Sequence, residues 1–286
     1  MEEVNKPLVS VIMGVYNSKS CKLLKKSIDS ILNQSYSNIE FIICDDCSTN
    51  INIKKILEEY RQIDKRVKII TNGRNSGLAF SLNNCLKNAS GEYIARQDDD
   101  DISHLTRLEK EIDYLNKNPG IDFVGCTINL YNKNGVWGIR RVNKNPTKED
   151  LIKGSQFAHP SLLFRKKVFD IVEGYRVEKI TRRVEDYDLY MRIYGLGLKG
   201  GNLQEIYYDY YEGDETYKNQ RIKYKIDELK VRKRGYKEMG ISSLKSKVYI
   251  IKPLMSAIIP RMIRKRINKK NAKGNKTSNI ARDLNF

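Results

Sequence analysis

The segment Gly91-Glu92-Tyr93-Ile94-Ala95-Arg96-Gln97-Asp98-Asp99-Asp100-Asp101 decides how the rest of the chain is interpreted. Residues 92–96 follow a glycine and have good strand propensity, so they predict a short β-strand. The four aspartates after it repel one another unless a cation lies among them. Carboxylate oxygens suit Mg²⁺ or Mn²⁺, and ligands of α/β sheets bind beyond the carboxyl ends of the strands. The segment therefore predicts a metal site, with a solvated acidic turn as the alternative.

Apolar strands and amphipathic helices alternate before this segment. The predicted strands are 8–16, 39–44, 67–71 and 92–96, and the predicted helices are 20–33, 53–61 and 78–87. This order predicts an α/β fold with a mostly parallel central sheet flanked by helices.

The pattern after the aspartates is less regular. Helices are predicted at 105–116, with Leu105 facing inward, at 146–154 and at 187–194. Strands are predicted at 121–131, 162–164 and 202–211, and Lys133-Asn134-Gly135 predicts a turn.

The positive charge lies in the last quarter of the chain. The net charge is +18, but residues 1–216 hold 32 basic and 31 acidic side chains, whereas residues 217–286 hold 21 and 4. A basic tail on a nearly neutral body predicts an anionic partner, either a membrane surface or nucleic acid.

The tail itself divides into three parts. Residues 217–239 predict a charged, solvated helix, and residues 268–286 predict disorder. Residues 241–267 predict an amphipathic helix, kinked at Pro253 and Pro260, that either lies in a membrane interface or packs on the body. Its apolar face consists of Leu244, Val248, Ile251, Met255, Ile258 and Met262.

Cysteine usage and hydropathy indicate a cytoplasmic protein. The five cysteines form no regular framework, which is typical of a reducing compartment. Cys44 and Cys47 form a C-x-x-C pair without a second pair or a nearby histidine, so incidental cysteines are favoured over a zinc or redox site. No signal peptide is predicted, and no stretch reaches the ~20 apolar residues of a membrane span.

Taken together, these motifs make residues 7–216 similar to a family 2 glycosyltransferase of the GT-A fold. Each motif alone is weak, and the specificity comes from their order and spacing. The matching segments are Val9 to Asn17, Cys44 to Thr49, Arg74 to Gly77 with Asn83, Gln97 to Asp101, His159 to Ser161, and Glu185 to Asp188.

The resemblance implies roles for residues on the donor side of such a site. It implies that a nucleotide-sugar donor, with uridine favoured, is bound by Val15, Tyr16, Asn17, Asp45, Asp46, Arg74, Gly77, Asn83, Asp98 and Asp99. It further implies that Asp98 and Asp100 hold Mn²⁺ or Mg²⁺, which neutralises the diphosphate leaving group. Asp101 is expected to support the following helix, and a helix N-cap is the alternative role for Asp45-Asp46.

On the acceptor side, the resemblance implies that Asp186, with Glu185 beside it, takes the proton from the attacking hydroxyl. In-line attack would invert the anomeric configuration. His159 and Tyr187 are expected near the acceptor. The alternatives are a helix-start role for Asp186 and a structural role for His159.

Two segments depart from the family pattern. Cys47 stands where the family prefers glycine, so a positive φ there would be strained. Residues 207–213 carry Asp209 and Tyr211 where the family often has arginine and histidine. A metal or phosphate contact from that histidine is therefore not expected here.

The expected function is transfer of a sugar to a glycan or lipid-linked acceptor, in cell-surface polysaccharide synthesis at the inner face of the membrane. The expected domains are a catalytic domain at 1–216 and a membrane-associating basic tail at 217–286, with no nucleic-acid partner. A sugar-phosphate nucleotidyltransferase is an alternative, although the chain lacks the Gly-rich loop of that chemistry. A noncatalytic binder acting through the tail is another, but it leaves Asp98–Asp101 and Glu185-Asp186 unexplained.

Overall fold

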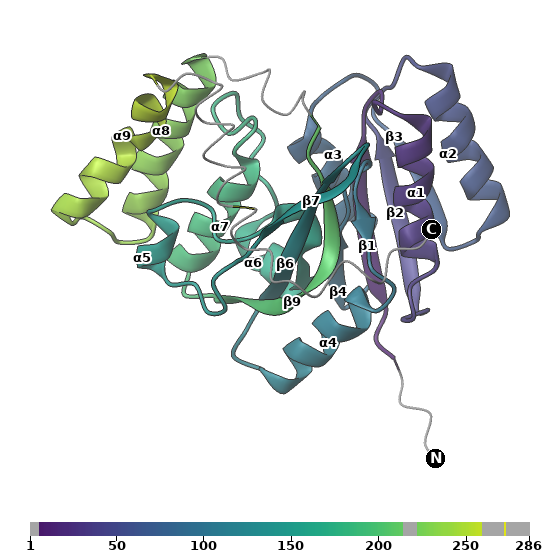
Figure 1. Ribbon diagram of the computed structural model, residues 1–286, viewed down its shortest axis with the longest axis horizontal. Helices are drawn as coiled ribbons and strands as arrows, with labels where there is room; N and C mark the ends of the chain where they lie inside the picture. Colours follow the sequence, from purple (N-terminus) through teal and green to yellow (C-terminus); the bar gives the residue numbers. More distant parts are fainter. Residues whose placement is uncertain (1–5, 214–221, 259–271, 273–286) are drawn as a thin grey trace.

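The computed structural model describes residues 6–213, 222–258 and 272 (Figure 1). The strands of this part of the chain form one sheet in the order β3-β2-β1-β4-β8-β6-β9-β5, with β7 paired to β6. The strand bounds are β1 Val9–Val15, β2 Ile39–Asp45, β3 Val67–Thr71, β4 Tyr93–Arg96, β5 Ile102–Ser103, β6 Phe123–Asn132, β7 Gly135–Arg140, β8 Leu163–Arg165 and β9 Gly200–Tyr211.

Helices cover both faces of this sheet. Their bounds are α1 Cys21–Leu32, α2 Ile51–Ile63, α3 Leu78–Lys87, α4 Arg107–Lys117, α5 Lys148–Leu151, α6 Lys167–Val172, α7 Glu185–Gly195, α8 Ile222–Glu238 and α9 Leu244–Ile258, with a 3₁₀ turn at His159–Ser161. In Figure 1, α1 and α2 lie at one end of the molecule, and α8 and α9 lie at the other.

The first four strands form the parallel half that the sequence predicts. β1 pairs in parallel with β2 and β4, and β2 pairs in parallel with β3. Alternate residues of β1 face opposite ways: Val11 packs in the core beneath α1, α2 and α4, and Ile12 packs in the core with α3, α6 and α7. A strand buried on both faces needs the near-continuous apolar run that the sequence has at this position.

The second half of the sheet is mixed. β8 runs antiparallel to both β4 and β6, β5 runs antiparallel to β9, and β6 pairs in parallel with β9. The predicted fold class is confirmed, with as many antiparallel as parallel strand pairings in the described sheet. The sequence did not reveal β5, β7 or α6, which are short or half-exposed.

The predicted start of α4 is wrong. The helix begins at Arg107, and the Leu105 side chain is 62% exposed rather than buried. The carbonyl of Leu105 instead accepts a hydrogen bond from the Ser35 backbone N–H at 2.9 Å, so this residue belongs to the loop that joins the aspartates to α4.

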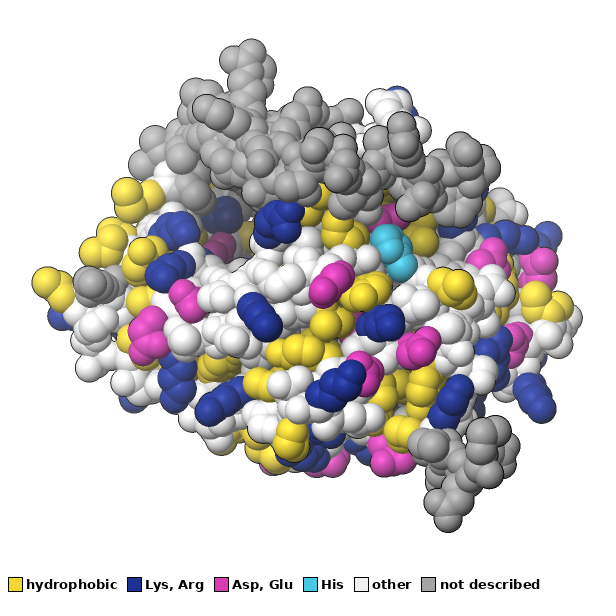
Figure 2. All heavy atoms as spheres, turned by 60° about the horizontal axis from the view of Figure 1, so that its bottom comes forward, with side chains coloured by type: hydrophobic (Ala, Val, Ile, Leu, Met, Phe, Trp, Pro, Cys, Tyr) yellow, Lys and Arg dark blue, Asp and Glu magenta, His cyan; other side chains and the backbone are white. Residues whose placement is uncertain are grey.

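Helix α8 also differs from the prediction of a solvated helix. It contacts α7 and buries Val231, Arg232 and Tyr236, and the Arg232 guanidinium lies 4.9 Å from the ring centroid of Tyr187. The helix is therefore part of the folded body. On the face shown in Figure 2, basic and acidic side chains are interspersed, as the near-neutral charge of residues 1–216 predicts.

Helix α9 packs on α8 and leaves much of its apolar face exposed. Its Leu244 side chain is 77% exposed, and Val248, Ile251 and Met255 are exposed as well. Pro260, Met262 and residues 268–286 other than Ala272 lie outside the described residues. Within the described part of the chain, no helix is both long and apolar enough to cross a bilayer.

Candidate active site

Two adjoining cavities open at the carboxyl ends of the parallel strands. The first cleft, about 620 Å³, is lined by Val15, Tyr16, Asp46, residues 75–79 and a segment within residues 176–185. The second cleft, about 520 Å³, is lined by Asp98, Arg140, His159 and Asp186 among others. Leu78, Arg183 and Glu185 line both clefts and mark the boundary between them. Ligands of α/β sheets bind at this edge.

The loops after β1 and β2 are joined by Asn17. Its side-chain oxygen accepts hydrogen bonds from the backbone N–H groups of Thr49 at 2.9 Å and Asn50 at 3.0 Å. Its own N–H donates to the Ser48 hydroxyl at 3.0 Å. Asn17 therefore shapes the wall of the first cleft, while the adjacent Tyr16 side chain is 49% exposed within that cleft.

The two aspartates after β2 are buried and hold loop backbone. Asp45 accepts the Ser48 N–H at 2.9 Å, a turn contact, and the N-cap of α2 is Asn50, so the N-cap alternative for these aspartates is wrong. Asp46 accepts the N–H groups of Ser76 and Gly77, both at 2.8 Å, and so fixes the loop that leads into α3. Gly77 has φ +92, a conformation that side chains rarely adopt.

Six of the ten predicted donor-side residues do not line the first cleft: Asp98 lines the second, and Asn17, Asp45, Arg74, Asn83 and Asp99 line neither. The Asn83 amide donates to the carbonyl of Tyr175 and accepts its N–H, each at 2.8 Å, on the opposite side of α3. Arg74 is exposed and is not among the residues lining either cleft.

The four consecutive aspartates each have a different partner. Asp98 pairs with the fully buried Arg96, and Asp99 accepts a hydrogen bond from the Ser18 hydroxyl. Asp100 pairs with Lys19 at 3.2 Å. Asp101 accepts the backbone N–H of Tyr211 at 2.7 Å, so it ties the segment to β9. The expectation that Asp101 supports the following helix is therefore wrong.

Burial and mutual repulsion raise the pKa values of these carboxyl groups. Desolvation, followed by the charge of Asp100, raises the pKa of Asp99 to about 7. Desolvation, followed by the charge of Asp98, also raises the pKa of Asp100. A divalent cation would relieve both penalties, so the segment fits the predicted metal. No three described His, Cys, Asp or Glu residues form a metal-holding group by themselves, so a bound ion would need oxygens from its ligand.

Glu185 and Asp186 form the first turn of α7, where the two clefts meet. Desolvation, and next the charge of Asp186, raises the pKa of Glu185 to about 7. Desolvation raises the pKa of Asp186 to about 6, against hydrogen bonds from the backbone at the start of the helix. A carboxylate with a pKa just below neutrality suits a general base.

His159 lies in the second cleft with Asp98 and Asp186. Its Nε2 is 2.9 Å from the Tyr175 hydroxyl. Burial, and next the charge of Arg96, lowers the pKa of His159 well below its usual range, so the ring is neutral. Tyr187 is 4% exposed, its hydroxyl donates to the Leu151 carbonyl, and it does not line the second cleft.

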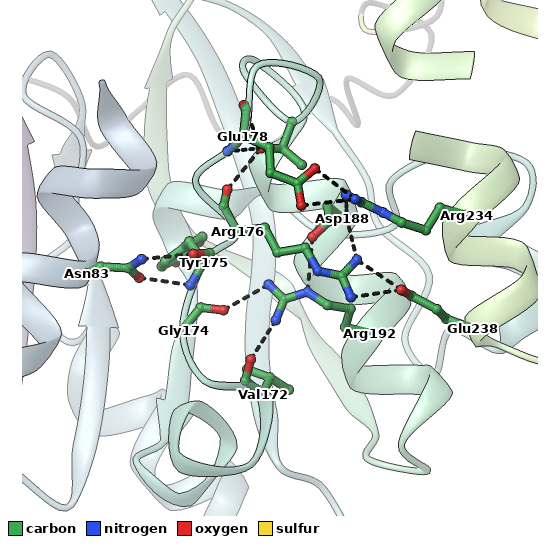
Figure 3. A network of polar contacts seen from close by, with 11 residues as sticks. Asn83, Val172, Gly174, Tyr175, Arg176, Glu178, Asp188, Arg192, Arg234 and Glu238 are labelled. Atoms are coloured by element: carbon green, nitrogen blue, oxygen red, sulfur yellow. Dashed lines mark hydrogen bonds and ion pairs between the residues drawn. The ribbon is translucent and has the colours of Figure 1, made fainter. Parts of the chain in front are cut away.

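Sequence reasoning missed the role of Asp188, two residues beyond Asp186. Its buried carboxylate pairs with Arg192 at 3.0 Å, with Arg234 at 2.9 Å and with Arg176 at 3.3 Å (Figure 3). Arg192 also donates to the carbonyls of Val172 and Gly174. This cluster joins α7 to α8 and to the loop before Glu185 and Asp186. The only sequence signal was the acidic spacing in Glu185 to Asp188.

Both departures from the family pattern have structural counterparts. Cys47 does adopt a positive φ, at +61, the conformation that would be strained for a residue with a β-carbon. Asp209 accepts a hydrogen bond from the Asn129 amide and lies 2.8 Å from His104 Nε2, so it forms a local polar contact within the β6–β9 region.

The profile of glycosyl transferase family 2 matches residues 10–172. The chain belongs to this family. EpsE of Bacillus subtilis (strain 168) is 38% identical to this glycosyltransferase over 264 residues, covering 92% of the chain and 94% of EpsE. The UDP-Gal:alpha-D-GlcNAc-diphosphoundecaprenol beta-1,3-galactosyltransferase of Escherichia coli is 28% identical, covering 92% of the chain and 96% of that enzyme.

A solved structure of Staphylococcus aureus TarS residues 1–349 with UDP-GlcNAc superposes on this glycosyltransferase with a TM-score of 0.64. The match covers 85% of this chain and 70% of the TarS chain at 21% identity. The likeness confirms the predicted GT-A fold, and the family match confirms the predicted glycosyltransferase class.

Proposed function

We propose that this glycosyltransferase moves a sugar from a UDP-sugar to a hydroxyl of a glycan or lipid-linked acceptor, with inversion, in the synthesis of a cell-surface polysaccharide. The observation that carries the proposal is that the two clefts meet at Glu185, with Asp98 and Asp186 both lining the second. A site for transfer between two substrates needs two such compartments with the reacting groups at their junction.

The first cleft is proposed to hold the nucleoside of the donor. Tyr16 offers an exposed aromatic ring there, and Val15 and Asp46 complete the wall. Asn17 and Asp45 act by fixing the loops of this wall, because their polar atoms are already bonded to backbone. The TarS complex with UDP-GlcNAc supports a uridine donor for this fold.

The donor diphosphate is proposed to lie beside the aspartate segment. Asp98 and Asp100 would hold Mn²⁺ or Mg²⁺, and Asp99 would face the donor. The ion supplies positive charge that neutralises the diphosphate as it leaves. Lys19, already paired with Asp100, adds a fixed cation at the same place.

Asp186 is proposed as the general base. The acceptor hydroxyl attacks the anomeric carbon, the bond from that carbon to the diphosphate oxygen breaks, and UDP leaves. The hydroxyl proton passes to the Asp186 carboxylate. Attack from the face opposite the leaving group inverts the anomeric centre. Glu185 adjoins the base at the boundary of the clefts, and the neutral His159 can hydrogen-bond the acceptor.

A membrane-bound acceptor is proposed because of the carboxyl-terminal region. The exposed side chains of Leu244, Val248, Ile251 and Met255 recur at helical spacing along α9. Residues 217–286 also carry 21 basic and 4 acidic side chains. An apolar stripe within a basic segment suits a surface of anionic lipid. The galactosyltransferase relative acts on a diphosphoundecaprenol-linked sugar, which fits the same location.

The test is release of UDP across a panel of UDP-sugars, with Mn²⁺, with Mg²⁺ and with a chelator. Metal-dependent release from one donor supports the proposal and names the sugar. Binding of a donor without release directs the search to acceptors in membrane extracts. If no UDP-sugar is bound or hydrolysed under any condition, the proposal is wrong.

A further inference from the structure

We propose that the Arg183 guanidinium binds the donor diphosphate and neutralises it as UDP leaves, acting as a further cation in addition to the metal and Lys19. The inference rests on the proposed function and adds a residue that the family resemblance did not supply.

The position of Arg183 follows from the two clefts. Leu78, Arg183 and Glu185 are the residues shared by their linings. If the nucleoside occupies the first cleft and the acceptor the second, the bond that breaks lies at this boundary. Of the three shared residues, Leu78 is apolar and Glu185 is acidic. Arg183 is the shared residue that can carry a positive charge to a departing diphosphate.

The backbone of Arg183 is held in an uncommon conformation. Its φ is +74, in the region that favours glycine, two residues before the active carboxylates of α7. A residue with a β-carbon is strained there, so glycine would be the more stable choice. The presence of a long cationic side chain at this strained position, where it lines both clefts, points to a function of that side chain.

The surroundings of Arg183 hold it without neutralising it. Its guanidinium lies 5.2 Å from the ring centroid of Tyr224 on α8. Among the ion pairs between described residues, none involves Arg183. The nearby Arg176 and Arg234 are different in this respect, since both pair with Asp188. The positive charge of Arg183 is therefore available to an anionic ligand. Because the side chain is exposed and its contact with the Tyr224 ring is weak, the guanidinium can move from that ring into the cleft.

Binding of UDP and of uridine, each with Mn²⁺, separates a phosphate contact from a structural role. We would compare wild type with Arg183→Gly, Arg183→Gln and Arg183→Lys by calorimetry, and would measure Tm for each. Arg183→Gly should weaken UDP binding tenfold or more, leave uridine binding within twofold, and keep or raise Tm because glycine accepts the positive φ. Arg183→Lys should retain more UDP affinity than Arg183→Gln.

The matched control is Glu173→Gly, since Glu173 also has a positive φ, at +56, but lines neither cleft. It should raise or keep Tm and leave both affinities unchanged. The inference is overturned if Arg183→Gly binds UDP as wild type does, or if UDP and uridine affinities fall together with Tm. Wild type that binds no UDP would instead overturn the proposed function, and the inference with it.

Discussion

At the scale of single residues, identical side chains have different tasks because their surroundings differ. The aspartates from Asp98 to Asp101 are equivalent in sequence, yet Asp98 pairs with a buried arginine and Asp101 with the backbone of β9. Asp46 is expected to bind the nucleotide of the donor, yet its two carboxylate oxygens accept hydrogen bonds from the backbone N–H groups of Ser76 and Gly77. The contacts of Asp46 and Asp101 join residues 30 or more positions apart in the chain, so no local pattern contains them, whereas the pair of Asp98 with Arg96 is local.

Replacing Asp186 by asparagine should abolish transfer and stabilise the protein. General-base removal costs about 10²–10⁴ in kcat. Because the folded pKa of Asp186 is raised to about 6 from 3.8, its contribution to stability is present below pH 3.8 and lost as pH rises through 6. At pH 7.5 the free energy of unfolding of the variant should therefore be higher by about 1 kcal/mol, after allowance for solvent screening, and its Tm should be higher as well.

The same raised pKa predicts the pH profile of the wild type. Transfer should fall as pH drops below about 6, because a protonated Asp186 cannot accept the hydroxyl proton. A kcat that is flat from pH 5 to pH 8, or an Asp186→Asn variant with wild-type kcat, would contradict the role of this residue.

The positive φ of Cys47 gives a prediction with an internal control. Cys47→Gly should raise the free energy of unfolding by about 0.5–1 kcal/mol, because glycine accepts φ +61 without strain. Cys47→Ala keeps the β-carbon and should give no such gain. Thermal melts of the two variants decide the matter, and equal Tm values for them would contradict the strain.

At the scale of elements, helix α7 carries the proposed catalytic carboxylates and is held by the charge of Asp188 in the same first turn. Asp188 joins it to Arg176 in the preceding loop and to Arg234 on α8 (Figure 3). Asp188 therefore ties the preceding loop and α8 to α7. This arrangement explains why α8, although strongly charged, is packed rather than solvated.

Asp188→Asn should destabilise the protein strongly. Removing one partner of a buried charge cluster costs about 3–5 kcal/mol of unfolding free energy, because the three arginines would lose the negative charge that neutralises them. Asp113→Asn is the matched control, since Asp113 forms an exposed pair with Lys117 at 2.8 Å. Surface pairs of this kind contribute about 0–1 kcal/mol. Urea unfolding of both variants should separate them clearly, and similar midpoints would refute the role of Asp188.

The elements predicted from sequence are those with a strong repeating pattern. β1 to β4 and α1 to α3 have apolar runs or helical spacing, and their existence and order were predicted correctly. β5 has two residues, too few for any periodicity, whereas the apolar run at 162–164 did predict β8. Helix α8 was wrongly predicted to be solvated because it carries many charged residues. One of them, Arg232, is buried over the ring of Tyr187, and the number of charges in a helix does not show such burial.

The candidate site was predictable to the level of its segments but not its contacts. The sequence placed Asp98, His159 and Asp186 in one site, and the structure brings them together in the second cleft. Asn83 and Tyr187 have the spacing of the family motifs but point into packing contacts with Tyr175 and Leu151. Motif spacing fixes the position of a backbone, whereas the direction of a side chain depends on tertiary neighbours.

At the scale of the whole molecule, a nearly neutral body carries a basic carboxyl-terminal region with an apolar stripe on α9. The proposed membrane contact predicts sedimentation with vesicles of phosphatidylglycerol but not of phosphatidylcholine, weakened by salt. Substituting Val248, Ile251 and Met255 by serine should release the protein from the vesicles. Ile63→Ser is the control, because Ile63 is 69% exposed on the distant α2. Equal loss of binding in the control, or none in the triple variant, would contradict the proposal.

Calorimetric titration of UDP shows whether the clefts and the aspartate segment form one metal-dependent nucleotide-sugar site. We predict binding in the presence of Mn²⁺, with at least a tenfold loss on adding a chelator or in Asp100→Asn, whose Tm should not fall because a repelling charge is removed. UDP binding that is equal with and without metal, or unchanged in Asp100→Asn, would contradict the account.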